Sequence, residues 1–172
     1  MALKVGDTTV KKVKVVKDGA TTDLKELYVG DILVWKSETV VASAFSSGTA
    51  QNWANCNTSK SSSTFTCDVG DVITFTCVQH LQADNAGFTA EYNLGIGGGY
   101  TIYKDNVKVE TEERDVQFNA TQSYKDQTWN VSYTVTSAGA YRVVLYAFVG
   151  EKTDLNIYAS SYTKITSDII VS

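Results

Sequence analysis

The sequence predicts an all-β protein, with an N-terminal β-hairpin ribbon followed by an antiparallel β-sandwich. Long helical patterns are missing, and proline is absent from the 172 residues. Apolar and polar residues alternate in VITFTCV, WNVSYTV and YRVVLYAFV, which is the period of half-buried strands. Turn signals rich in glycine, asparagine and aspartate separate these stretches at short spacing, as is typical of a sandwich or barrel.

The chain begins with one motif written twice. Leu-x-Val-Gly-Asp-x-x-Val occupies residues 3–10 and again residues 27–34. In each copy the glycine supplies the positive φ that a tight hairpin turn needs, and Asp18-Gly19 offers another turn between the copies. A ribbon of two or three strands is only marginally stable in water, so it must dock on its own sandwich, a sister subunit or a larger assembly.

The composition changes near Lys36, where lysine-rich strands give way to a stretch dense in small polar residues. We therefore expect three parts. Residues 1–37 form an N-terminal β-ribbon attachment module, called the ribbon below. Residues 38–63 form an extended linker segment, and residues 64–172 form the sandwich.

Charge and cysteine content exclude several classes of protein. The net charge of −4 offers no global basic field, so we expect no nucleic-acid partner. Residues 1–36 carry seven lysines and five acidic residues, whereas the rest carries eight basic and fourteen acidic residues. No apolar run has the length of a signal peptide or a transmembrane helix, so we expect no membrane partner and synthesis in a cytoplasm. Three cysteines, an odd number, then indicate reduced thiols.

The sequence contains no catalytic, cofactor-binding or metal-binding constellation. The single histidine, His80, has no Cys, His or Asp ligands at metal-site spacing. GIGGGY at residues 95–100 has the wrong spacing for a dinucleotide fingerprint, and we expect a bent or flexible loop there. The acidic residues 110–115 are expected to form a solvated strand or loop. We therefore expect no enzyme and no cofactor.

Two stretches of the predicted sandwich resemble immunoglobulin domains. DVGDVITFTC at residues 68–77 is similar to the second strand of that fold, and SAGAYRVVL at residues 137–145 is similar to its F strand. The resemblance implies an Ig-like sandwich with Tyr141 as a tyrosine corner. Val143 stands where the family has its second cysteine, so Val143 is expected to pack against Cys77.

A disulfide between Cys67 and Cys77 depends on how the chain turns at Gly70 and Asp71. A two-residue hairpin would hold the two cysteines too far apart to bridge, whereas a bend between sheets leaves the question open. We favour free, buried thiols.

A second resemblance concerns about residues 9–36. VKKVKVVKDGATTDLKELYVGDILVWK resembles the β-hairpin segment of structural proteins of tailed bacteriophages. It implies a virion component made in the host bacterial cytoplasm, namely an auxiliary or decoration protein of the capsid or a head fibre. Its partners would be other capsid or tail proteins, with self-association possible, and its outward domain would meet host or mucosal glycans. A tail or baseplate protein is the alternative within this class, and a carbohydrate-binding adhesion module with a platform of tyrosines, Trp53 and Trp129 is the alternative outside it.

The second copy of the motif supplies the expected assembly interface. In DILVWK, Ile32 and Val34 point to one face and Leu33 and Trp35 to the other, so both faces are apolar. One face can pack within the protein, and the other needs a second apolar surface. We expect Trp35 and Leu33 to be buried against a partner chain or against the linker segment. The expected interface residues are Leu27, Tyr28, Val29, Leu33 and Trp35.

Overall fold

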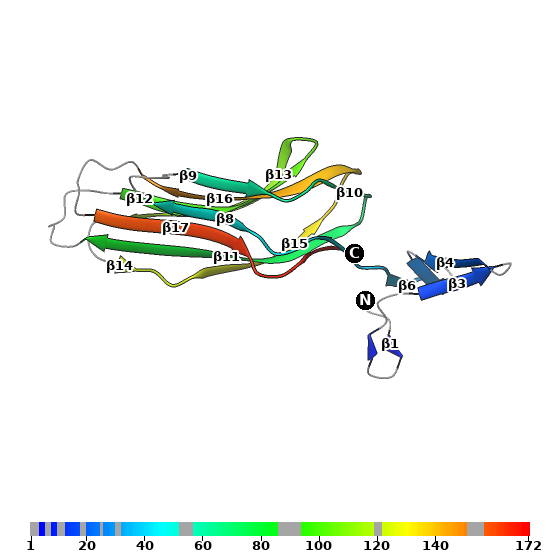
Figure 1. Ribbon diagram of the computed structural model, residues 1–172. Coiled ribbons are helices and arrows are strands. Elements are labelled where there is room, and N and C mark those ends of the chain that lie inside the picture. Colours follow the sequence, from blue (N-terminus) through cyan, green and yellow to red (C-terminus); the bar gives the residue numbers. More distant parts are fainter. Residues whose placement is uncertain are drawn as a thin grey trace.

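The computed structural model confirms the all-β class. It describes residues 4–5, 8–9, 13–17, 20–24, 26–29, 32–51, 57–85, 94–118, 122–150 and 157–172. Every regular element among these residues is a β-strand. Two antiparallel sheets pack face to face as the predicted sandwich, and three hairpins precede them (Figure 1).

The larger sheet has four lanes, because several of its seven segments run end to end beside the same neighbour. The long strand β11 (Val72–Asn85) lies inside the sheet. On one side it pairs with β14 and β15, and on the other with β17 and β18, which pair in turn with β8 and β7. These segments are β14 (Gln122–Ser123), β15 (Gln127–Thr134), β17 (Ile157–Ile165), β18 (Ile169–Val171), β8 (Ser46–Gln51) and β7 (Thr39–Ala42).

The smaller sheet also has four lanes. In the first, β9 and β10 run end to end beside β16, and the order continues through β12 to β13. A tight turn at Asp105 and Asn106, with φ of 48° and 68°, joins β12 to β13. The Asp-Asn pair is one of the turn signals from which the sequence predicts such turns. The bounds are β9 (Asn57–Ser61), β10 (Phe65–Cys67), β16 (Gly139–Val149), β12 (Leu94–Lys104) and β13 (Val107–Phe118).

The strand order of the two sheets is that of a jelly roll. Along the chain, the first lane (β7 and β8) pairs with the last (β17 and β18), and the second (β9 and β10) pairs with β16, the seventh. The third pairs with the sixth, β11 with β15, and the fourth with the fifth, β12 with β13. These four pairs are those of one long hairpin folded over into two sheets, which is the arrangement of a jelly roll. An immunoglobulin domain instead pairs its last strand with its F strand, whereas here the last lane lies beside β11 in the opposite sheet.

The tyrosine corner that the sequence predicts is present. Tyr141 is fully buried at the start of β16, and its hydroxyl donates a hydrogen bond to the Ser137 carbonyl oxygen at 2.7 Å. Val143 and Cys77 belong to one hydrophobic cluster, so valine fills the place of the second immunoglobulin cysteine. The local immunoglobulin features therefore hold although the strand order differs.

The chain crosses from one sheet to the other between Cys67 and Cys77. Cys67 pairs with Gly139 in the smaller sheet, and Cys77 pairs with Ile165 in the larger one. Both thiols are free and buried, as predicted. Burial raises the pKa of Cys67 to about 11 and that of Cys77 to about 12, so both stay protonated at neutral pH.

The loop predicted at residues 95–100 is wrong, because these residues lie within β12. Glycine normally weakens a strand, and a run of them looks like a loop when only the sequence is known. Here β12 is an inner strand, held by β16 on one side and by β13 on the other.

Residues 38–63 also contain more regular structure than an extended linker. They include β7, β8 and β9, which complete the outer lanes of both sheets. These strands are rich in serine and threonine because few of their side chains are buried; in β8 these are Ser47 and Ala50. The division into folding units at residues 37 and 63 stays a prediction.

Three short hairpins form the ribbon. They lie beyond the end of the sandwich where β10 and the C-terminus are found (Figure 1). Each hairpin is a two-stranded sheet of its own. The strands are β1 (Lys4–Val5), β2 (Thr8–Thr9), β3 (Val13–Lys17), β4 (Ala20–Leu24), β5 (Glu26–Val29) and β6 (Ile32–Lys36).

Candidate attachment site

Both copies of the doubled motif form hairpins, as predicted. Val5 pairs with Thr8, so these residues flank Gly6-Asp7. Val29 pairs with Ile32 in the same way and flanks Gly30-Asp31. In both copies the strands that flank Gly-Asp therefore pair as a two-stranded hairpin.

The hairpin of β5 and β6 exposes large apolar side chains. Tyr28, Val29 and Ile32 are 50%, 66% and 68% exposed, whereas Leu27 is half-buried. The expected interface residues Leu33 and Trp35 have backbones paired with Tyr28 and Leu27, and their side chains lie outside the described part of the chain. The role of these five residues in assembly stays a prediction.

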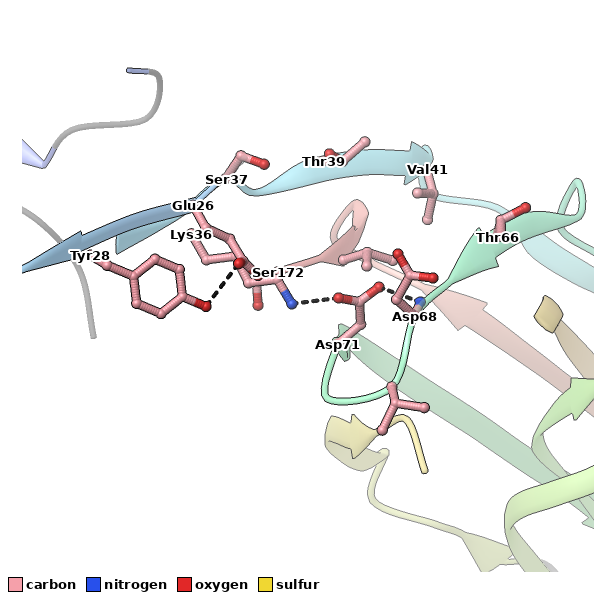
Figure 2. A pocket seen from close by; sticks show the side chains of 12 residues that line it. Glu26, Tyr28, Lys36, Ser37, Thr39, Val41, Thr66, Asp68, Asp71 and Ser172 are labelled. Carbon is pink, nitrogen blue, oxygen red and sulfur yellow. Dashed lines mark hydrogen bonds and ion pairs between the residues drawn. The ribbon is translucent and has the colours of Figure 1, made fainter. Parts of the chain in front are cut away.

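A third Val-Gly-Asp joins the ribbon to the sandwich. At Val69-Gly70-Asp71 the glycine has φ +90°, and the Asp71 carboxylate accepts a hydrogen bond from the Asp68 backbone N–H at 2.8 Å. The Lys36 ammonium, at the end of β6, forms an ion pair with the same carboxylate (Figure 2). The turn that connects the two sheets thus also binds the last residue of β6.

A cavity of about 610 Å³ opens around this ion pair. Figure 2 shows that its walls come from the ribbon, from β7 and from the turn after β10. Near its mouth the Tyr28 hydroxyl donates a hydrogen bond to the Glu26 carboxylate at 2.9 Å, which raises the pKa of Tyr28. The residues that line the cavity are Glu26, Tyr28, Lys36, Ser37, Thr39, Val41, Thr66, Asp68, Val69, Asp71, Val171 and Ser172.

The side chains of this cavity fit a structural contact between ribbon and sandwich better than a catalytic site. We call this contact, made by Lys36 and Asp71, the joint. Its lysine is paired with Asp71, and its remaining polar groups are carboxylates, hydroxyls and backbone. Sequence reasoning missed the joint. The available signal was the third Val-Gly-Asp, which repeats the ribbon motif at the start of β11.

The other candidate residues occupy structural positions. His80 Nδ1 lies 2.7 Å from Asp126 Oδ1, and the His80 ring stacks on Tyr162 at 4.9 Å. Trp129 packs against the core, edge-on to Tyr100, and Trp53 lies outside the described residues. The acidic residues 110–115 lie in β13, at the edge of the smaller sheet.

Searches of the described residues add two findings. Within the part of the chain that the structure describes, no three His, Cys, Asp or Glu side chains gather as a metal site. No helix there is long and apolar enough to cross a bilayer.

Comparisons with known proteins give matches to solved structures alone. No protein-family model matches the chain, and no curated protein matches it. A structure of infectious bursal disease virus strain Gx matches with a TM-score of 0.35 and 12% identity, over 92% of this chain and 48% of that one. The crystal structure of the infectious bursal disease virus VP2 subviral particle matches with a TM-score of 0.34 and 9% identity, over 92% and 47% of the two chains. The chain thus spans about half the length of these proteins, and at such similarity its function must be argued from its own residues.

Proposed function

We propose that the protein is a non-enzymatic structural component of a tailed-phage particle. In this proposal it is an auxiliary or decoration protein of the head, or part of a head fibre. The ribbon docks on the particle, and the jelly-roll sandwich is displayed outward. Jelly rolls serve in viral capsids and in lectins alike, so the fold permits this role without proving it.

The observation that carries the proposal is the exposed apolar hairpin of β5 and β6. Within the described residues, no strand of the ribbon pairs with a strand of the sandwich. Val29 and Ile32 therefore stay largely in water in the single chain. Exposed apolar side chains gathered on one element are typical of a surface that another chain covers. The resemblance of residues 9–36 to phage structural proteins supports another virion protein as the covering chain.

Placement on the particle can be tested by electron microscopy. A gold-labelled antibody against the sandwich should decorate the heads of purified virions that carry this chain. Label on the tail would select the tail or baseplate alternative. Particles without any label would contradict a virion role.

The docking surface can be tested with Trp35→Ala. We predict that this variant folds but no longer joins the particle, since truncating a large buried aromatic side chain typically costs roughly 3–5 kcal/mol. The matched control is Val107→Ala, an exposed apolar residue at the β12–β13 turn, which should join the particle normally. Normal incorporation of Trp35→Ala, measured by immunoblot of purified particles, would remove the main support for attachment through the ribbon.

A further inference from the structure

Three consecutive glycines stand in the middle of β12, an inner strand of the smaller sheet. Glycine inside a strand destabilises it relative to alanine, so a run of three needs a reason. At Gly98 an added Cβ would lie 2.7 Å from Thr163 Oγ1, because the opposite sheet approaches there. At Gly99 it would lie 2.0 Å from the Glu112 backbone oxygen. The close approach of the opposite sheet therefore explains Gly98, and the close approach of the β13 backbone explains Gly99.

Gly97 has a different neighbour, the ring of Phe148. An added Cβ at Gly97 would lie 2.4 Å from Phe148 Cζ, 2.8 Å from its Cε1 and 2.5 Å from the Arg114 backbone oxygen, so the ring crowds Gly97 in addition to the backbone of β13. Phe148 belongs to the adjacent strand β16 and pairs with Gly97. Its ring therefore lies across β12 and not upright from its own strand. The glycine makes room for a flat ring on the outer face of the sheet.

Tyr146, two residues earlier on β16, lies across the sheet in the same way. It pairs with Gly99, which in turn pairs with Glu113 of β13. The Tyr146 hydroxyl reaches beyond Gly99 and donates a hydrogen bond to Glu113 Oε2 at 2.7 Å. Adjacent strands are about 4.8 Å apart, so the Tyr146 side chain must reach across two strand spacings to make this bond. Its phenol ring therefore lies against the sheet. Burial and the Glu113 hydrogen bond raise the pKa of Tyr146, which keeps its hydroxyl a donor.

The floor under both rings is fixed from inside the sandwich. Ser161 Oγ donates to the Gly97 carbonyl oxygen at 2.7 Å, and Thr163 Oγ1 donates to the Tyr146 carbonyl oxygen at 2.8 Å. Both hydroxyls come from β17 of the opposite sheet. Such inter-sheet bonds hold the backbone that carries the rings, so the flat arrangement is set before any ligand arrives.

Polar side chains border the two rings on both sides. The register places Asn57 of β9 beside Phe148 and Ser59 beside Tyr146. On the far side of the glycines, Asp115 lies in the Phe148 row and Glu113 in the Tyr146 row. All four polar residues are exposed. Residues that pair directly across strands share one face of a sheet, so these groups border the rings on the outer face.

We propose that this outer face, the aromatic platform formed by Tyr146 and Phe148, binds a neutral sugar residue of a glycan. A pyranose has an apolar C–H face that fits a flat ring and a rim of hydroxyls that needs acceptors and donors. The carboxylates of Glu113 and Asp115 accept hydroxyl hydrogen bonds on one side, and the Asn57 amide and Ser59 hydroxyl offer mixed bonding on the other. The two carboxylates also repel sialic and uronic acids, which selects neutral sugars.

The aromatic platform lies far from the ribbon. Asp71, which binds Lys36, follows closely after Cys67, and Cys67 pairs with Gly139 at the start of β16. Phe148 stands near the other end of that strand. Phe148 is nine positions after Gly139 in an extended strand, a distance of about 30 Å. Among the described residues no ribbon strand pairs with this sheet, so sugar binding and attachment can be tested separately.

The test is a glycan array of neutral, sialylated and uronic-acid oligosaccharides probed with the fluorescently labelled full chain. The chain should retain neutral oligosaccharides, and the best of them is then titrated by calorimetry against variants. Phe148→Ala should weaken binding roughly tenfold or more, and Glu113→Gln roughly threefold to tenfold. Tyr162→Ala is the matched control, because it removes a half-buried aromatic side chain from the outer face of the opposite sheet. It should bind like the parent chain.

Several outcomes would overturn the proposal. These are an array with no neutral glycan retained, a preference for sialylated glycans, or equal losses in Phe148→Ala and Tyr162→Ala. A parent chain that sediments as a dimer and a Phe148→Ala variant that sediments as a monomer would instead assign the platform to a protein interface. If Phe148→Ala fails to fold by circular dichroism, Glu113→Gln decides, because Glu113 is exposed and its loss leaves the core intact.

Discussion

The ribbon and the sandwich are both built from antiparallel strands, but they differ in where their apolar side chains lie. Along β16 every second residue from Tyr141 to Val149 is buried, and the opposite sheet covers that face. Along β5 and β6 the apolar residues Val29 and Ile32 remain exposed. The two sheets of the sandwich therefore cover each other's apolar inner faces, whereas Val29 and Ile32 of the ribbon have no such cover among the described residues. This difference is the basis of the proposal that the sandwich folds by itself and that the ribbon attaches.

Truncating one apolar side chain in each region tests this comparison. Leu145→Ala should lower the free energy of unfolding by about 2–5 kcal/mol, because Leu145 is fully buried in the core. Ile32→Ala should change it by no more than about 0.5 kcal/mol, because Ile32 is mostly in water. Urea unfolding followed by circular dichroism measures both. Comparable losses in the two variants would mean that the ribbon belongs to the folded core.

Alkaline pH should act on the sandwich through its buried thiols. The pKa of Cys67 is raised from 9.0 to about 11 and that of Cys77 to about 12, so above pH 9 the unfolded chain loses protons that the folded chain keeps. Stability is then fully present below pH 9 and falls as the pH rises toward 11. The melting temperature should decrease over that window. The decrease should be smaller in a Cys67→Ala, Cys77→Val double variant, and an unchanged pH profile in this variant would contradict the assignment.

The tyrosine corner offers a smaller and more local effect. Tyr141→Phe removes the hydrogen bond to the Ser137 carbonyl oxygen and should cost about 1 kcal/mol, a typical net value for one such bond. Tyr162→Phe, in the half-buried outer face of β17, is the control and should leave unfolding unchanged. Thermal unfolding of the two variants would show whether the corner stabilises the connection between β15 and β16. Equal melting temperatures for Tyr141→Phe and the parent chain would show that it does not.

Sequence patterns predicted individual strands better than their partners. Alternation marks β11, β15 and β16 because each has one buried and one wetter face. The hairpin turns followed from Val-Gly-Asp, and the tyrosine corner from SAGAY. These are local signals, and they depend on residues close together in the chain.

Strand order was harder to predict because pairing depends on distant residues. The last strands could lie beside β16 or beside β11. Both strands show the same alternation of apolar and polar residues, so the sequence does not distinguish the two places. Polar strands such as β8 and β9 carry few apolar residues because they are outer lanes. The glycines of β12 appear as a loop until the ring of Phe148 and the backbone of β13 are placed against them.

The joint between ribbon and sandwich was not predicted, although the third Val-Gly-Asp marked one side of it. Lys36 and Asp71 are 35 residues apart, and nothing in either local pattern pairs them. The interface residues Leu27, Tyr28, Val29, Leu33 and Trp35 were predicted from their apolar pattern, and their role in attachment stays a prediction.

The central claim, that the sandwich folds without the ribbon, is tested most directly by melting a chain of residues 38–172. This chain keeps every strand from β7 to β18 and loses the ribbon, including the Lys36 partner of Asp71. We predict a β-type circular dichroism spectrum and a cooperative melting transition within a few degrees of the transition of the full chain. A spectrum of an unfolded chain, or melting without cooperativity, would show that the ribbon is part of the core and would contradict the division into a part that folds and a part that attaches.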